Sequence, residues 1–202
     1  ADEVTLAEIN NAVNNYSPSV VKIFLDPGHG AQDPGGEGYG LKEKNVVLDI
    51  ALKTADFLTK NYLGVAINLS RTSDRFLELE ERAQLANTWG ADYFVSFHNN
   101  AFNGSASGFE SYIYSGNTSK ETKEKQEKIH QYLASKINAN DRGMKEANFS
   151  VLRNTNMPAI LLEYLFIDNI VENSLLKNDR YREWLGEITA EALAQSFNLK
   201  KR

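Results

Sequence analysis

The sequence predicts a single α/β domain with a central, mostly parallel, twisted sheet that helices flank on both faces. First, apolar runs typical of strands alternate with the apolar spacing of helices from residue 20 onward. Second, 42% of the 202 residues are hydrophobic and 24% are charged, as in ordinary folded proteins. Third, no repeat or biased segment divides the chain, so we expect one domain over residues 20–202.

The first 19 residues precede this alternation. Residues 5–14 have the pattern of a short helix, and Ser17 and Pro18 break it. We expect residues 1–19 to be an extension or linker that packs on the domain. The chain begins Ala1-Asp2-Glu3, without Met or an apolar leader, so we expect a mature form or a fragment of a longer protein.

The first predicted strand covers residues 20–25, a short apolar run that ends at Asp26-Pro27-Gly28. Six glycines lie between residues 26 and 41, which predicts an irregular loop over the end of this strand. A crossover helix is then expected over residues 43–61, because its apolar positions follow a three-four spacing. These positions are Val46, Val47, Ile50, Ala51, Thr54, Phe57 and Leu58.

The remaining segments continue the same alternation. Strands are expected at residues 65–69, 93–97, 109–114 and 159–167, with a short strand at 151–152. Helices are expected over residues 76–89, 121–138 and 181–197. Repeated strand-helix-strand order predicts that neighbouring strands run parallel.

Charge and composition exclude several classes of function. Lys and Arg total 22 and Asp and Glu total 27, and the net charge of −5 predicts no nucleic-acid or anionic-membrane partner. The absence of cysteine excludes disulfides, thiolate metal sites and cysteine nucleophiles. The densest apolar run, residues 159–167, is interrupted by Glu163 and is far shorter than the ~20 residues that span a bilayer.

Two of the three histidines follow predicted strands. His29 follows the first predicted strand, and His98 follows the third predicted strand in chain order. Ligands of open α/β sheets bind beyond the carboxyl ends of the strands. We therefore expect these two imidazoles at one rim of the sheet. His130 lies in a polar helical segment beside Lys128 and Gln131, which predicts a solvated side chain.

Glu43 opens the long crossover helix and lies on the same helical face as Val47 and Ile50, so its carboxylate is expected to point inward. One interpretation is a favourable charge at a helix N-terminus. The other is a ligand for a divalent cation, because the flanking Lys42 and Lys44 are expected to lean outward.

Glu163 interrupts an otherwise apolar strand. An unpaired buried carboxylate destabilises a fold, so Glu163 needs a partner or a place at the strand end facing the ligand crevice. The partner interpretation is a buried salt bridge to Arg71, Arg82 or Arg153. The alternative is a general base or acid with a raised pKa.

Two imidazoles and one carboxylate form a three-ligand set typical of catalytic zinc, which leaves a fourth position for water. The sequence contains no His-Glu-x-x-His motif, no Gly-x-Ser-x-Gly elbow and no phosphate loop. The candidate chemistry is therefore metal-assisted hydrolysis.

Five short segments carry a family resemblance. In chain order they are Lys22 to Gly30, Leu41 to Lys44, Ser70 to Asp74, Phe97 to Ala101 and Pro158 to Glu163. Together they resemble the zinc-dependent N-acetylmuramoyl-L-alanine amidases of the amidase-3 family, over residues 20–197. Such enzymes occur as bacterial autolysins, sporulation cell-wall hydrolases and phage endolysins.

The resemblance implies that His29, Glu43 and His98 hold one zinc ion and that Glu163 is the catalytic glutamate. It implies that residues 20–202 form an amidase domain, which cuts the amide between N-acetylmuramic acid and L-alanine in peptidoglycan. The expected place of action is extracellular or in the cell wall. The resemblance assigns no residue to substrate binding.

Asn99 and Tyr164 depart from the residues common in the family, which predicts a difference in cleft shape and stem-peptide preference. The loop from residue 101 to 109 is too short for a blocking helix, so we expect an open site. Because anionic wall polymers would repel a domain of charge −5, we expect a separate wall-binding module outside this chain. We also expect the protein to be a monomer.

Two other functions remain open from the sequence. The same metal chemistry would serve a zinc carboxypeptidase or another peptidase. The second open function is a wall-binding module that uses the crevice only for docking. A carboxylate within an apolar strand adds little to such a site, which argues against this function.

Overall fold

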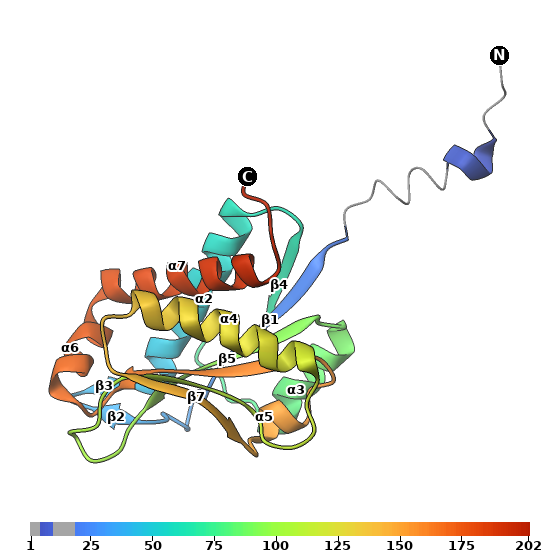
Figure 1. The fold of residues 1–202 in the computed structure, drawn as a ribbon. Helices are drawn as coiled ribbons and strands as arrows, with labels where there is room; N and C mark the ends of the chain where they lie inside the picture. The colour runs from blue at the N-terminus through green and yellow to red at the C-terminus, as the bar shows by residue number, and fades with distance from the viewer. Residues whose placement is uncertain (1–4, 10–18) are drawn as a thin grey trace.

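A six-stranded sheet forms the centre of the computed structural model, which describes residues 5–9 and 19–202 (Figure 1). Its strands are β1 (Val21–Pro27), β4 (Val65–Leu69), β5 (Tyr93–Asn100), β6 (Phe109–Tyr114), β7 (Asp141–Ala147) and β8 (Ala159–Phe166). They are arranged in the order β4-β1-β5-β8-β6-β7. All neighbours are parallel except β8 and β6, so the predicted mostly parallel sheet is confirmed.

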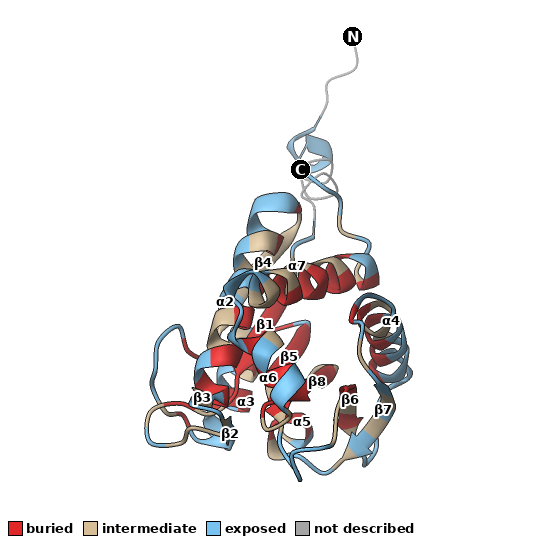
Figure 2. Cartoon of the chain, turned by 90° about the vertical axis from the view of Figure 1, so that its left-hand side faces the viewer, coloured by how far each residue is buried: buried red, intermediate tan, exposed pale blue. Residues whose placement is uncertain are grey.

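Helices cover both faces of this sheet, as predicted. The helices are α2 (Glu43–Asn61), α3 (Leu79–Trp89), α4 (Lys120–Lys136), α5 (Ser150–Arg153), α6 (Ile170–Lys177) and α7 (Asp179–Ser196). The larger apolar core lies between the sheet and α2, α4 and α7, and the smaller core lies beneath α3 and α5. Figure 2 shows the buried residues concentrated between these layers.

Helix α2 begins at Glu43 and ends at Asn61, the bounds that the apolar spacing predicts. Val47 and Ile50, on the inner face of α2, are fully buried, and the helix packs against α7 and the central strands. Burial of this face fixes the start of α2 beside the carboxyl ends of β1 and β5. A two-stranded hairpin, β2 (Glu37–Gly38) with β3 (Leu41–Lys42), leads into the helix from the glycine-rich loop.

The β2–β3 hairpin lies largely within the segment that was predicted to be an irregular loop, and three further elements also differ from the sequence prediction. Val151 and Leu152 form a turn of α5 rather than a strand, because both side chains are buried in the core that this helix shares with α3. Strand β7 was not predicted, because its polar residues form an edge strand that pairs only with β6. Helix α6 was not predicted either; it starts where the Asn169 side chain accepts hydrogen bonds from Val171 N and Glu172 N.

The described part of the N-terminal segment is residues 5–9, in which residues 6–9 are helical and exposed. Residues 10–14 of the predicted helix lie outside the described residues, and the packing of residues 1–19 on the domain stays a prediction. Among residues 5–9 and 19–202, no helix has the length and apolar character needed to cross a lipid bilayer.

Candidate metal centre and active site

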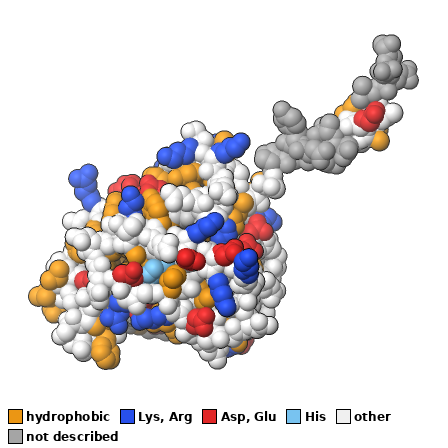
Figure 3. Space-filling view, in the orientation of Figure 1, with side chains coloured by type: hydrophobic (Ala, Val, Ile, Leu, Met, Phe, Trp, Pro, Cys, Tyr) orange, Lys and Arg blue, Asp and Glu red, His pale blue; other side chains and the backbone are white. Residues whose placement is uncertain are grey.

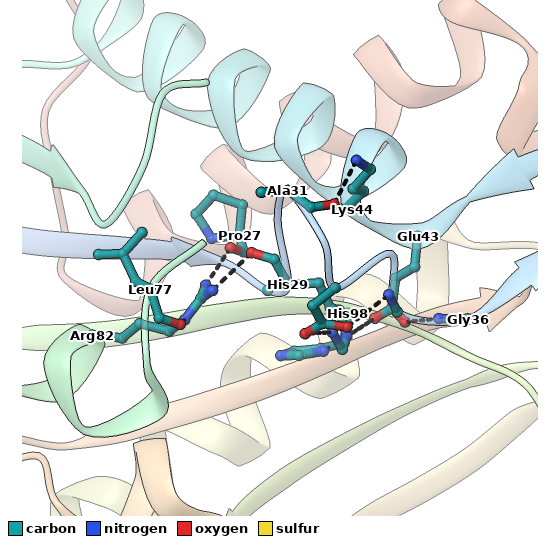
Figure 4. Close-up of polar contacts among 12 residues, drawn as sticks. Pro27, His29, Ala31, Gly36, Glu43, Lys44, Leu77, Arg82 and His98 are labelled. Atoms are coloured by element: carbon teal, nitrogen blue, oxygen red, sulfur yellow. Dashed lines mark hydrogen bonds and ion pairs between the residues drawn. The ribbon is translucent and has the colours of Figure 1, made fainter. Parts of the chain in front are cut away.

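His29, Glu43 and His98 meet at the carboxyl ends of β1 and β5 (Figure 4). His29 follows β1, Glu43 is the first residue of α2, and His98 lies in β5. Glu43 Oε2 is 3.1 Å from His29 Nε2 and 3.1 Å from His98 Nδ1. The candidate ligand atoms of the three residues lie within 4.8 Å of one another, so the predicted ligand set is brought together.

Two glycines leave the space that this group occupies. A Cβ on Gly28 would lie 2.3 Å from His98 Cε1, and a Cβ on Gly35 would lie 2.6 Å from Glu43 Oε1. Gly35 also has a φ of 68°, a conformation that L side chains rarely adopt. The glycine-rich loop therefore permits the imidazoles and the carboxylate to approach one another.

Backbone N–H groups hold the Glu43 carboxylate in place. Gly36 N donates to Oε1 at 2.8 Å and Asn99 N donates to Oε2 at 3.0 Å. Burial by itself raises the pKa of Glu43, but the contacts with His29 and His98 outweigh it and hold the pKa well below its ordinary value. The Glu43 carboxylate is therefore ionised and has a fixed orientation.

Each imidazole is oriented by a partner on its other nitrogen. His29 Nδ1 lies 2.8 Å from Asp33 Oδ2, and its Nε2 faces Glu43. His98 Nε2 donates to Ser96 Oγ at 3.0 Å, and Ser96 Oγ in turn donates to Asp26 Oδ2 at 2.8 Å. These contacts turn Nε2 of His29 and Nδ1 of His98 toward the Glu43 carboxylate.

Asp26 is itself fixed by buried donors. Ser70 Oγ donates to Asp26 Oδ1 at 2.7 Å, and Arg82 Nη1 donates to the same oxygen at 3.0 Å. Carboxylate partners of this kind hold the ligand histidines of metal sites in one tautomer and orientation. The donor set therefore fits a divalent metal: two imidazole nitrogens and one carboxylate oxygen converge, and each is held by a second contact.

Sequence reasoning did not single out Asp26, Asp33 or Ser96. A signal existed for two of them. Asp26 directly follows the predicted first strand. Ser96 precedes His98 by two residues, so the side chains of Ser96 and His98 lie on the same face of β5. Asp33 lies in the irregular loop, where no periodicity indicates direction.

Glu163 lies in β8 directly opposite His98 in β5. Its Oε2 is buried and has no hydrogen-bond partner within residues 5–9 and 19–202. Burial raises the pKa of Glu163 well above its ordinary value, and the charges of Glu43 and Glu110 raise it further. This carboxyl group is therefore placed beside the candidate ligands in the environment of a general acid or base.

The predicted alternative of a salt bridge to Glu163 is not formed by any of the three arginines named for it. Arg71 donates to the carbonyl oxygens of Pro27, Gly28 and Lys44. Arg82 pairs with Asp26 and also donates to the carbonyl oxygen of Pro27, a contact drawn in Figure 4, and Arg153 donates to Asn148.

The structure contradicts two predictions about single side chains. His130 is only 3% exposed and not solvated, because α4 packs on β6 and places its imidazole between Ser111 Oγ at 2.7 Å and Asp141 Oδ1 at 2.8 Å. Lys44 does not lean outward, because its Nζ binds Asp74 Oδ2 at 2.8 Å and Ala31 O at 2.9 Å. Lys44 thereby ties α2 to the glycine-rich loop.

Asn99 and Tyr164 were predicted to alter the cleft, but both are buried. Asn99 Nδ2 donates to Tyr164 O at 2.6 Å, and Tyr164 Oη lies 2.6 Å from Thr189 Oγ1 of α7 in the larger core. The side chain of Tyr164 therefore points away from the site. Residues 101–108 contain no helix, in agreement with the prediction for this loop, and His29 and His98 are 24% and 16% exposed at the surface.

Fold and site together define a hydrolase domain with a candidate centre for one metal ion. The family model described as "N-acetylmuramoyl-L-alanine amidase" matches residues 23–195. The chain belongs to this family, the amidase-3 family of N-acetylmuramoyl-L-alanine amidases.

Three relatives support the assignment. A sporulation-specific N-acetylmuramoyl-L-alanine amidase of Bacillus subtilis is 47% identical over 182 residues, which are 90% of this chain and 70% of the relative. The endolysin of Bacillus phage SPP1 is 46% identical, over 89% of this chain and 67% of the endolysin. The crystal structure of an N-acetylmuramoyl-L-alanine amidase from Clostridium difficile 630 has a TM-score of 0.85 and 35% identity, over 89% of this chain and 98% of that one.

Proposed function

We propose that this chain uses one zinc ion to hydrolyse the amide bond between N-acetylmuramic acid and L-alanine in peptidoglycan. The observation that carries the proposal is the convergence of His29, Glu43 and His98 beside the buried carboxyl group of Glu163. Family membership supports the substrate, and the donor set supports the metal.

His29 Nε2, His98 Nδ1 and a Glu43 carboxylate oxygen would hold the ion. Zinc suits this set, because imidazole nitrogen and carboxylate oxygen are its usual catalytic ligands besides thiolate. When bound there, zinc lowers the pKa of a water molecule toward about 7 and polarises the scissile carbonyl. Asp33 and Ser96 would keep the two imidazoles in the tautomers that bind a metal.

Glu163 would accept the proton of the attacking water and deliver it to the amine of L-alanine as that group leaves. Its position opposite His98 in the sheet supports this role. A carboxyl group with a raised pKa is suited to this task, because it is a stronger base than an ordinary carboxylate and can still return the proton. Two carboxylates thus have separate roles, since the pKa of Glu43 is held low and the pKa of Glu163 is raised.

The chemical test is identification of products from purified cell walls. The proposal predicts new amino-terminal alanine without new reducing sugar, and a chelator should abolish this release while added zinc restores it. Release of a carboxy-terminal amino acid would instead identify a peptidase. A domain that binds walls but releases nothing would be a binding module.

We also propose that the enzyme acts at the cell wall, as a monomer, with help from a separate wall-binding module. The substrate class places the action at the wall. Figure 3 shows Lys and Arg interspersed with Asp and Glu on the face drawn, so this face offers no broad basic patch to anionic polymers. Equal wall affinity of this domain and of the native full-length protein would contradict the module.

A further inference from the structure

A row of paired residues continues from the candidate metal centre across the sheet. His98 of β5 pairs with Glu163 of β8, Glu163 pairs with Glu110 of β6, and Tyr112 of β6 pairs with Lys145 of β7. Directly paired residues point to the same face of a sheet, and so do residues two apart in one strand. Glu110, Tyr112 and Lys145 therefore share the face that carries His98 and Glu163.

Glu110 is the centre of a buried polar network at the far end of this row. The residue is 4% exposed, and its Oε1 accepts hydrogen bonds from Asn100 Nδ2 and Tyr112 Oη, each at 2.9 Å. Its Oε2 accepts from Arg142 Nε at 3.1 Å and from Lys145 Nζ. Burial raises the pKa of Glu110, but these donors outweigh it and lower the pKa, so the group is ionised at neutral pH.

The two cations on Glu110 exceed its charge and remain accessible. The side chains of Arg142 and Lys145 are 32% and 36% exposed, whereas Glu110 is buried beneath them. The guanidinium carbon of Arg142 lies 4.9 Å from the ring centre of Phe166, so this side chain is held from two sides. Within residues 5–9 and 19–202, Arg142 Nη2 makes no hydrogen bond. The cluster therefore presents positive charge and unused donors to a ligand.

The order of groups along the row gives the direction of the substrate. In the proposed mechanism, the scissile carbonyl lies at the candidate metal centre and the leaving amine lies at Glu163. The peptide that follows the amine therefore extends from Glu163 toward β6 and β7. Adjacent strands are ~4.8 Å apart and an extended residue spans ~3.5 Å, so the residue after L-alanine reaches this cluster.

We propose that Arg142 and Lys145 bind a carboxylate of the stem peptide, at the residue that follows L-alanine. Glu110 is the positioning residue that holds both cations in place. The inference rests on the proposed amidase function and adds to it a specificity site for an acidic peptide. A planar guanidinium beside an ammonium suits a carboxylate, which accepts hydrogen bonds from both.

The test compares two synthetic substrates with the zinc-loaded enzyme. One is N-acetylmuramyl-L-alanyl-D-glutamate with free carboxylates, and the other carries carboxamides in their place. Hydrogen bonds to a charged group have a larger effect than neutral ones, so the wild type should prefer the acid by about 10-fold or more in kcat/KM. Arg142→Gln and Lys145→Met should each reduce this preference, mainly through KM.

Matched variants separate recognition from stability. Arg153→Gln and Lys123→Met remove exposed cations on α5 and α4, and both should keep the wild-type preference. Arg142 and Lys145 also tie β7 to β6, so their loss can lower the melting temperature, but a purely structural role would leave the acid-to-amide ratio unchanged. Direct titration of the uncleaved acid into Glu163→Gln, with and without Arg142→Gln, gives the binding readout.

The outcomes are distinct. A wild type that cleaves both compounds equally, or variants that retain the full preference, would overturn the carboxylate site and leave the amidase function intact. A wild type that cleaves neither compound while it fails to release alanine from walls would overturn the proposed function itself.

Discussion

Glu163 lies directly opposite His98 in the ladder between β5 and β8, and its Oε2 has no hydrogen-bond partner in the described part of the chain. The two side chains differ in their hydrogen-bond partners, which suits them to different roles. His98 is tied through Ser96 to Asp26 and so has a fixed orientation, whereas Glu163 retains an atom for a proton or a substrate. The account of catalysis depends on this division.

Glu163→Gln should therefore keep the metal and lose turnover, by about 10²- to 10⁴-fold, because general acid–base catalysis contributes in that range. His98→Ala and His29→Ala should lose both metal and turnover. Zinc content by elemental analysis, together with alanine release from walls, checks the contrast. Equal zinc content in all three variants would refute the ligand assignment.

Ser96→Ala should lower the affinity for zinc by about 10- to 100-fold, because the serine hydroxyl links His98 Nε2 to the Asp26 carboxylate. Ser70→Ala is the matched control, since Ser70 binds the other oxygen of Asp26 and has no contact with His98. Competition with a chromogenic chelator measures both affinities. Equal effects of the two substitutions on zinc affinity would show that the contact of Ser96 with His98 has no role beyond holding Asp26 in place.

Gly28→Ala should also weaken metal binding, because its Cβ would lie 2.3 Å from His98 Cε1 and displace the ring. Gly40→Ala provides the comparison: a φ of 78° costs an alanine about 1–2 kcal/mol, but no atom lies within 4 Å of the new Cβ. We expect Gly40→Ala to lower the melting temperature and leave zinc affinity unchanged. Wild-type zinc affinity in Gly28→Ala would contradict the close approach.

Glu110 should give stability that depends on pH. Its folded-state pKa is lowered, so its contribution is fully present above the unfolded value of about 4.3 and is lost as pH falls through the folded value. Glu110→Gln should therefore be less stable than wild type at pH 7, with a difference that shrinks in acid. Urea unfolding at a series of pH values measures it, and a difference that is constant with pH would exclude an ionised Glu110.

Much of the site could be predicted from the sequence, because strand periodicity and parallel order place His29 and His98 at one sheet rim. Glu43 was predicted to point inward from the helical spacing alone, and it does. Glu163 was notable as a carboxylate within an apolar strand. These features are local, so short windows of sequence contain them.

The remaining features arise from tertiary contacts. His130 lies in a polar helix, and only the packing of α4 on β6 buries it between Ser111 and Asp141. Arg142 and Lys145 lie in β7, whose polar residues resemble a loop until β6 pairs with them. No periodicity within one segment indicates that Glu110, Arg142 and Lys145 meet.

The most direct test is titration of the chelated wild-type protein with zinc, read as amino-terminal alanine released from purified walls. We expect the rate of alanine release to rise linearly with added zinc and to stop increasing at one zinc per chain. Full release before any metal is added, or a plateau only at two ions per chain, would contradict a single ion held by His29, Glu43 and His98.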